Sequence, residues 1–137
     1  MKPTSILITG ASGGIGSALA RVYAEPDVTL VLTGRDTSRL NDVADACRDL
    51  GAQIEVHTLD LRDTDRLRQW AGAISARHGI DLAIINAAIS HSMADAESGE
   101  HWETIEAIID TNLTAALATA DSVLPTMRSR GSLNTRQ

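Results

Sequence analysis

Short apolar runs alternate along the chain with longer segments in which apolar residues recur every three or four positions. Runs of the first kind, bounded by Gly, Pro or polar residues, predict buried strands, and the 3.6-residue period predicts amphipathic helices. We expect strands at 5–9, 28–33, 53–58 and 81–86, and helices at 13–25, 37–50, 63–77 and 100–127. Strict alternation of strand and helix is typical of βαβ units around a parallel sheet.

The helix expected at 37–50 shows the pattern clearly, because Leu40, Val43, Ala44 and Cys47 fall on one face. A second apolar stripe, formed by Trp102, Ile105 and Ile109 in the last helix, predicts a core contact or a subunit interface. Proline lacks an amide hydrogen and is expected to bend or shorten that helix at Pro125.

Right-handed crossovers and the Rossmann arrangement predict a strand order of 3-2-1-4. The fold class is therefore α/β, with a Rossmann-like parallel sheet and helices on both faces, in a single domain over residues 1–137. The strand order reverses between the first and fourth strands. A ligand is expected across their carboxyl ends.

Composition excludes several classes of function. The formal charge of −6 argues against nucleic acid as a partner, and no apolar run is long enough to cross a bilayer. The single cysteine, Cys47, rules out an internal disulfide, fits a reducing cytoplasm and is expected in the core. The four histidines lack the spacing of metal ligands, so no metal site is expected.

The turn between the first strand and the first helix reads Thr-Gly-Ala-Ser-Gly-Gly-Ile-Gly over residues 9–16. Glycine permits a sharp reversal and close approach of the backbone to phosphate, and the helix N-terminus directs amide groups at an anion. The alternative is an ordinary glycine-containing turn. The residues expected to bind a dinucleotide here are Thr9, Gly10, Ser12, Gly14, Ile15 and Gly16.

The spacing Thr-Gly-x-x-x-Gly-x-Gly directly after a strand resembles that of the short-chain dehydrogenase/reductase family. The resemblance implies hydride transfer between a nicotinamide cofactor and a small carbonyl or alcohol substrate. Arg35 matches the basic residue of NADP-preferring members, and Gly34 stands where NAD-preferring members carry an acid, so NADP(H) is favoured. Asp36 leaves NAD(H) possible, and the alternative for Arg35 is a surface arginine paired with Asp36 or Asp42.

Three further matches follow from the resemblance. Asp60 and Leu61 are similar to the pair that contacts adenine, although Asp60 could instead cap or turn the chain. The run Asn86, Ala87, Ala88 resembles the family's Asn-Ala-Gly motif, in which the asparagine would fix the strand end and the glycine turn; the alternative is a plain turn.

Asn112 matches the asparagine that holds a water in the family's proton relay, which makes it the expected catalytic residue; the alternative is a polar residue on an exposed helix face. The family's catalytic serine and Tyr-x-x-x-Lys pair have no counterpart. The one tyrosine, Tyr23, has Asp27 four residues later, and the one lysine is Lys2.

The resemblance therefore covers the first half of the family's fold, truncated before a fifth strand, and predicts a cofactor-binding portion that is inactive as given. The alternatives are a non-catalytic dinucleotide-binding or sensing module and a residual fold that binds nothing. A missing fifth strand would expose a sheet edge and an apolar helix face, which predicts a homo-oligomer formed through the fourth strand or the last helix.

Overall fold

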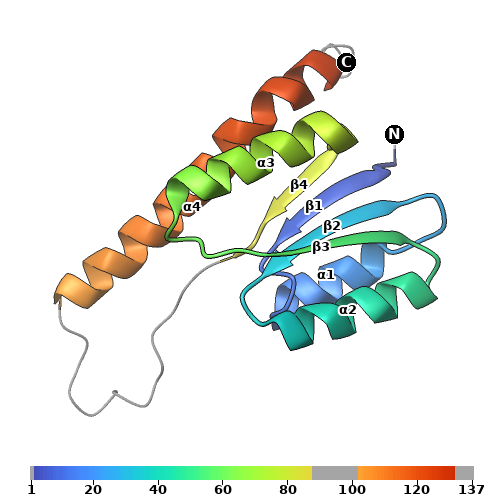
Figure 1. Cartoon of the computed structure of the whole chain (residues 1–137), viewed down its shortest axis with the longest axis horizontal. Coiled ribbons are helices and arrows are strands. Elements are labelled where there is room, and N and C mark those ends of the chain that lie inside the picture. The colour runs from blue at the N-terminus through green and yellow to red at the C-terminus, as the bar shows by residue number, and fades with distance from the viewer. Residues whose placement is uncertain (1, 88–101, 132–137) are drawn as a thin grey trace.

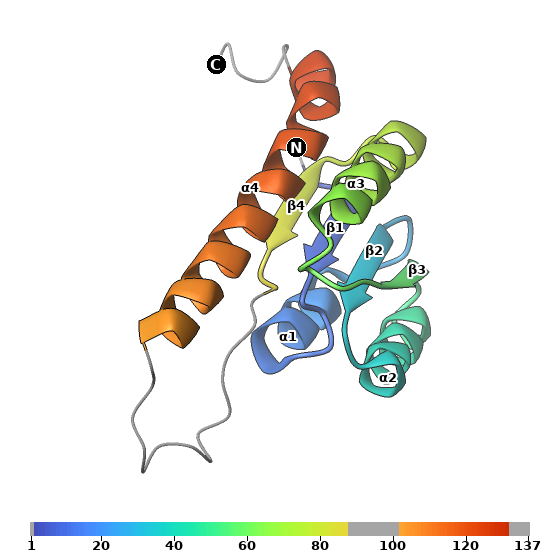
Figure 2. The ribbon, with the colours of Figure 1, turned by 60° about the vertical axis from the view of Figure 1, so that its left-hand side comes forward.

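The computed structural model describes residues 2–87 and 102–131. Four parallel strands form one sheet in the order β3-β2-β1-β4, as predicted. The strands are β1 (Ser5–Thr9), β2 (Thr29–Gly34), β3 (Gln53–Thr58) and β4 (Leu82–Ile85). The helices are α1 (Gly14–Tyr23), α2 (Thr37–Asp49), α3 (Thr64–His78) and α4 (Trp102–Gly131). The helices α1 and α2 cover one face, and α3 and α4 cover the other (Figure 1, Figure 2).

The central strand β1 supplies both halves of the core. Ile6 and Ile8 point toward α1 and α2, whereas Leu7 points toward α3 and α4, and all three are fully buried. Alternation of side chains across a sheet with two covered faces accounts for the continuous apolar runs that predict β1 and β2. Cys47 is buried in the first of these clusters, as expected, and burial raises the pKa of its thiol.

Local capping fixes where two helices begin and one ends. The carboxylate of Asp36 accepts from the backbone N–H of Arg39 at the start of α2, and Asp63 accepts from Arg66 in the same way at the start of α3. Gly79 ends α3 in the left-handed conformation, at φ 60°. The two aspartate caps thus follow the carboxyl ends of β2 and β3, and Gly79 ends α3 just before β4 begins at the amino end of the sheet.

The expected effect of Pro125 is wrong in one respect, because α4 continues past it to Gly131. Contacts with the rest of the fold lie on both sides of the proline. The Ser75 hydroxyl donates to the Val123 carbonyl at 3.4 Å, and Arg130 forms an ion pair with Asp81 at 3.3 Å. Packing across α3 and β4 therefore outweighs the loss of one amide donor.

Gly72 offers a direct stability prediction. It lies inside α3, and a Cβ atom added there would meet nothing within 4 Å. Alanine loses less backbone entropy in a helix than glycine does, so Gly72→Ala should raise the free energy of unfolding by about 0.5–1 kcal/mol. Urea unfolding followed by circular dichroism measures the change, and a decrease would contradict the open environment of Gly72.

Candidate functional site

The glycine turn between β1 and α1 is built by close backbone contacts. Gly10 adopts φ 68°, and Ala11 donates its backbone N–H to the Thr33 carbonyl at 2.9 Å, which joins the turn to β2. A Cβ atom on Gly16 would lie 2.1 Å from the Gly10 carbonyl oxygen, so this packing requires glycine. The first turn of α1 has no side-chain cap and no acidic residue. This leaves helix amide groups suited to an anion.

The end of β4 is tied to this turn by three hydrogen bonds. The Thr9 hydroxyl oxygen accepts from the backbone N–H groups of Asn86 at 3.0 Å and Ala87 at 3.1 Å. The Asn86 amide donates to the Gly10 carbonyl at 3.3 Å, which is the side-chain to backbone bond expected of it. The buried Thr9 and the half-buried Asn86 thus hold two strand ends in register beside the turn.

A cavity of about 230 Å³ opens beside the turn, at the carboxyl ends of the strands. Its lining residues are Gly10, Ser12, Gly13, Thr33, Gly34, Arg35, Leu59, Leu61, Asn86 and Ala87. The cavity therefore lies where the strand order reverses, the position expected for a ligand in this type of sheet. Leucine and alanine side chains, the glycine turn and the Arg35 guanidinium all contribute to its lining.

The structure brings together about half of the residues expected to bind a dinucleotide. Those at the cavity are Gly10, Ser12, Arg35, Leu61, Asn86 and Ala87, whereas Thr9, Gly14, Ile15, Gly16 and Asp60 are not among its lining residues. Ala88 lies outside the described residues. Sequence reasoning missed Gly13, Thr33, Gly34 and Leu59 as lining residues. Their positions at the ends of β2 and β3 and in the glycine turn were the available signal.

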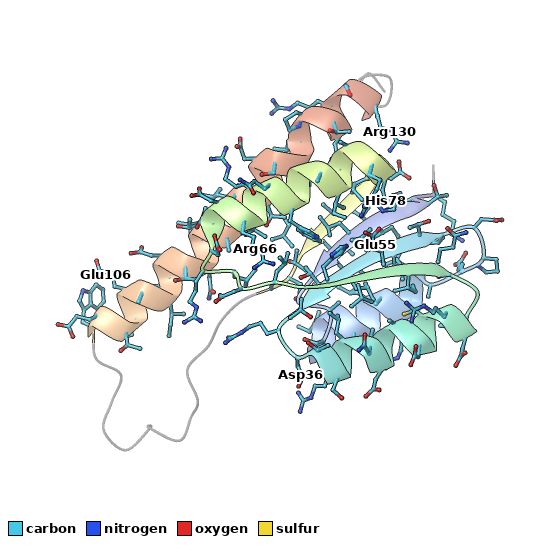
Figure 3. The ribbon with its side chains drawn as sticks, in the orientation of Figure 1. Asp36, Glu55, Arg66, His78, Glu106 and Arg130 are labelled. Atoms are coloured by element: carbon cyan, nitrogen blue, oxygen red, sulfur yellow. The ribbon has the colours of Figure 1, made fainter. Side chains whose placement is uncertain are left out.

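Arg35 extends from the end of β2 and is exposed. In the described part of the chain it forms no hydrogen bond or ion pair, so the expected alternative of a pair with Asp36 or Asp42 is wrong. Asp36 instead caps α2 and pairs with the guanidinium of Arg39 at 3.5 Å (Figure 3). Helix capping satisfies the Asp36 carboxylate locally, which leaves the Arg35 guanidinium available at the cavity.

Asp60 is exposed and forms a turn with the residue two positions on. Its carboxylate accepts from the Arg62 guanidinium at 3.0 and 3.1 Å and from the Arg62 backbone N–H at 3.0 Å. These hydrogen bonds, with a further contribution from the charge of Arg35, lower the pKa of Asp60 to about 2. The alternative of a helix cap is wrong, because Asp63 caps α3, but the turn is present.

The expected catalytic residue and the two excluded ones lie elsewhere. Asn112 is half-buried on α4 and is not one of the cavity's lining residues. Tyr23 packs against the core cluster under α1 and α2, and Lys2 pairs with Glu25. Neither the tyrosine nor the lysine can therefore act on a group bound in the cavity.

A second polar cluster, remote from the glycine turn, joins β3 to α3. Glu55 accepts from His57 at 2.8 Å and also from His78 and Arg77 (Figure 3). Burial raises the pKa of Glu55, but the histidine hydrogen bonds and the arginine charge outweigh it, so the pKa is lowered overall.

No metal-binding group of histidine, cysteine and carboxylate residues occurs in residues 2–87 and 102–131. None of the helices in those two ranges is long and apolar enough to span a membrane.

The sheet order, the glycine turn and the cavity at the reversal of strand order together define a Rossmann-like nucleotide-binding fold. Residues 4–133 match the family model described as short chain dehydrogenase, and the chain belongs to this family. Members of the family bind nicotinamide dinucleotides.

Individual relatives agree with this assignment. An uncharacterized oxidoreductase of Staphylococcus saprophyticus is 36% identical over 129 residues, covering 92% of this chain and 54% of the relative. An NADP-dependent 3-hydroxy acid dehydrogenase of Salmonella typhi is 32% identical over 131 residues, which cover 92% of this chain and 50% of the relative. The crystal structure of a metagenomic short-chain oxidoreductase in complex with NADP superposes with a TM-score of 0.78 at 29% identity. The match covers 93% of this chain and 57% of the other. The chain thus spans about half the length of the relatives that it matches.

Proposed function

We propose that this chain carries the cofactor-binding part of an NADP(H)-dependent short-chain oxidoreductase, and that these 137 residues alone do not catalyse hydride transfer. The observation that carries the proposal is the Arg35 guanidinium, which stands unpaired among the described residues at the rim of the cavity. An arginine at the end of the second strand suits the 2′-phosphate on the adenosine ribose of NADP(H). The 2′-hydroxyl of NAD(H) would instead be bound by a carboxylate acceptor. Relatives that are NADP-dependent or NADP-bound support the choice.

The residues present fit such a cofactor. The backbone between Gly10 and Gly16 would hold the pyrophosphate, because Gly13 and Gly14 have no side chain and the first amides of α1 have no side-chain cap. Leu61 would pack on the adenine, and Asp60 would accept from its amino group. Asn86, Ala87 and Ala88 would border the nicotinamide ribose. The bound nicotinamide would supply the hydride chemistry.

Asn112 is proposed to hold a water molecule in a proton relay once the rest of the family's fold is present. The substrate of that longer protein would be a small carbonyl compound or alcohol. The family's proton donor needs a tyrosine whose pKa is lowered by a lysine four residues later, because a free phenol titrates near pH 10. That pair does not occur in these residues. The proposed location is the cytoplasm, where the buried thiol of Cys47 would stay reduced.

Titration of the purified chain with NADPH and NADH, followed by fluorescence or calorimetry, tests the cofactor assignment. Loss of a charge-assisted contact to the 2′-phosphate is worth about 1.5–3 kcal/mol, so Arg35→Ala should weaken NADPH binding about 10- to 100-fold and leave NADH binding unchanged. Arg48→Ala is the matched control, because Arg48 pairs with Asp45 within α2. Equal losses for both nucleotides in Arg35→Ala would refute the phosphate contact.

We further propose that a second copy of this chain covers the outer stripe of α4, defined by Trp102, Ile109, Leu113, Leu117 and Leu124. These side chains are between 39% and 70% exposed, so Trp102 and Ile109 do not serve the core. Trp102 and Leu124 are equally distant from Leu113 in the sequence, and so are Ile109 and Leu117. Two antiparallel copies of α4 centred on Leu113 would therefore match apolar residue to apolar residue along the whole stripe.

Charge favours the same orientation. Glu103 lies in the first turn of α4, and Arg128 and Arg130 lie in its last turn. An antiparallel pair would bring the acidic end of each helix toward the basic end of the other, whereas a parallel pair would place like charges together.

A further inference from the structure

Three arginines and two carboxylates gather at the carboxyl ends of β2 and β3. Asp36 directly follows Arg35 in the sequence, and Asp60 lies two residues past the end of the neighbouring strand β3. Either carboxylate could pair with the Arg35 guanidinium and draw it out of the cavity. The structure shows that neither does, because each is held by a different arginine.

The two competing carboxylates are satisfied in different ways. Asp36 is held by helix capping and by the Arg39 guanidinium, an arrangement local to α2. Asp60 is held by Arg62 alone, through two guanidinium contacts at 3.0 and 3.1 Å and one backbone contact at 3.0 Å. The side-on arginine contact to both carboxylate oxygens is the strongest geometry available to such a pair.

Arg35 lies close enough to Asp60 for its charge to contribute to the lowered pKa of that carboxyl. Without the Arg62 guanidinium, Arg35 would be a cation within reach of an unpaired carboxylate. A phosphate ligand and the carboxylate would then compete for the same guanidinium, and uncompensated negative charge would stand beside the cavity.

We propose that Arg62 is a positioning residue for cofactor selectivity: by holding Asp60, it keeps the Arg35 guanidinium available to the 2′-phosphate of NADP(H). This inference rests on the proposed function. Arg62 is not itself a lining residue of the cavity, so its effect passes through Asp60 and Arg35. The selectivity of the site therefore depends on Arg62, which directly follows the proposed adenine-binding pair Asp60 and Leu61.

The test is a double-mutant analysis of NADPH and NADH dissociation constants in the purified full chain. Arg62→Ala should weaken NADPH binding about three- to fivefold, the scale of an exposed ion pair, and leave NADH binding unchanged. The double variant Asp60→Asn with Arg62→Ala should restore the NADPH to NADH ratio, because an amide does not capture Arg35. In an Arg35→Ala background, Arg62→Ala should not change that ratio.

Arg68→Ala is the matched control, because Arg68 is an exposed arginine of α3 that pairs with Asp121 at 3.3 Å. It should leave both nucleotide affinities unchanged. Melting temperatures should stay the same across all the variants, since every substituted side chain is exposed.

Three outcomes would overturn the inference: equal losses for both nucleotides in Arg62→Ala, no rescue by Asp60→Asn, or a further NADPH-specific loss in the Arg35→Ala background. The last of these would instead indicate direct contact between Arg62 and the phosphate. The failure of the proposed function looks different, because the unmodified chain would then bind neither nucleotide or would prefer NADH.

Discussion

Gly16→Ala is expected to unfold much of the chain and to abolish nucleotide binding. The added methyl group would lie 2.1 Å from the Gly10 carbonyl oxygen and 2.8 Å from its carbon, which are backbone atoms that cannot rotate away. The Asn86 amide, which ties β4 to the turn, would lie 2.9 Å from the same methyl group. Relief requires α1 to move off the sheet, so the free energy of unfolding should fall by about 3 kcal/mol. Urea unfolding and NADPH titration measure the two losses.

Gly14→Ala separates folding from binding at the same turn. A Cβ atom on Gly14 would meet nothing within 4 Å, so this variant should fold as stably as the unmodified chain. Its methyl group would nevertheless project from the first turn of α1, where we propose that the pyrophosphate lies, and should weaken NADPH and NADH alike. Normal stability in Gly16→Ala would contradict the close packing of α1 on Gly10.

Most of the fold could be predicted because its determinants are local. The apolar runs at β1 and β2, the repeat in α2 and the glycine after it specify the elements to within two residues of their observed ends. The sheet order follows from the handedness of βαβ crossovers. The end of α4 could not be predicted in this way. Its last turns are held by Ser75 and Asp81, which are distant in the sequence, and these contacts override the local effect of Pro125.

The backbone of the site could be predicted from the glycine motif, but the hydrogen-bond and ion-pair partners of its charged side chains could not. The strand ends that carry Thr9 and Asn86 lie beside the glycine turn because parallel strands share a carboxyl edge. The alternative of a pair between Arg35 and Asp36 stayed open from the sequence, because adjacency alone does not show which arginine the carboxylate binds. The spacing of Asp36 and Arg39 is that of a helix cap, and this signal could have excluded the pair with Arg35 in advance.

Leu113→Glu is expected to convert the chain from a dimer to a monomer at micromolar concentration. In the proposed antiparallel pair, Leu113 lies on the twofold axis, so one substitution places two carboxylates against each other in an apolar contact. Leu113 is 56% exposed in the single chain, so its replacement should have little effect on the fold itself. Burial of like charge should weaken association by about 3 kcal/mol or more, which is at least a hundredfold in the dissociation constant.

Thr114→Glu provides the matched control for this prediction. Thr114 is also exposed, but it lies about 100° around the helix from Leu113, outside the outer stripe of α4. The control should sediment with the unmodified chain, while Leu113→Glu sediments at half that mass with an unchanged melting temperature. If the unmodified chain is itself a monomer at these concentrations, the stripe is not a self-association surface. If both glutamate variants remain dimeric, the interface lies elsewhere, and the edge of β4 becomes the surface to test by placing a proline or lysine within Leu82–Ile85.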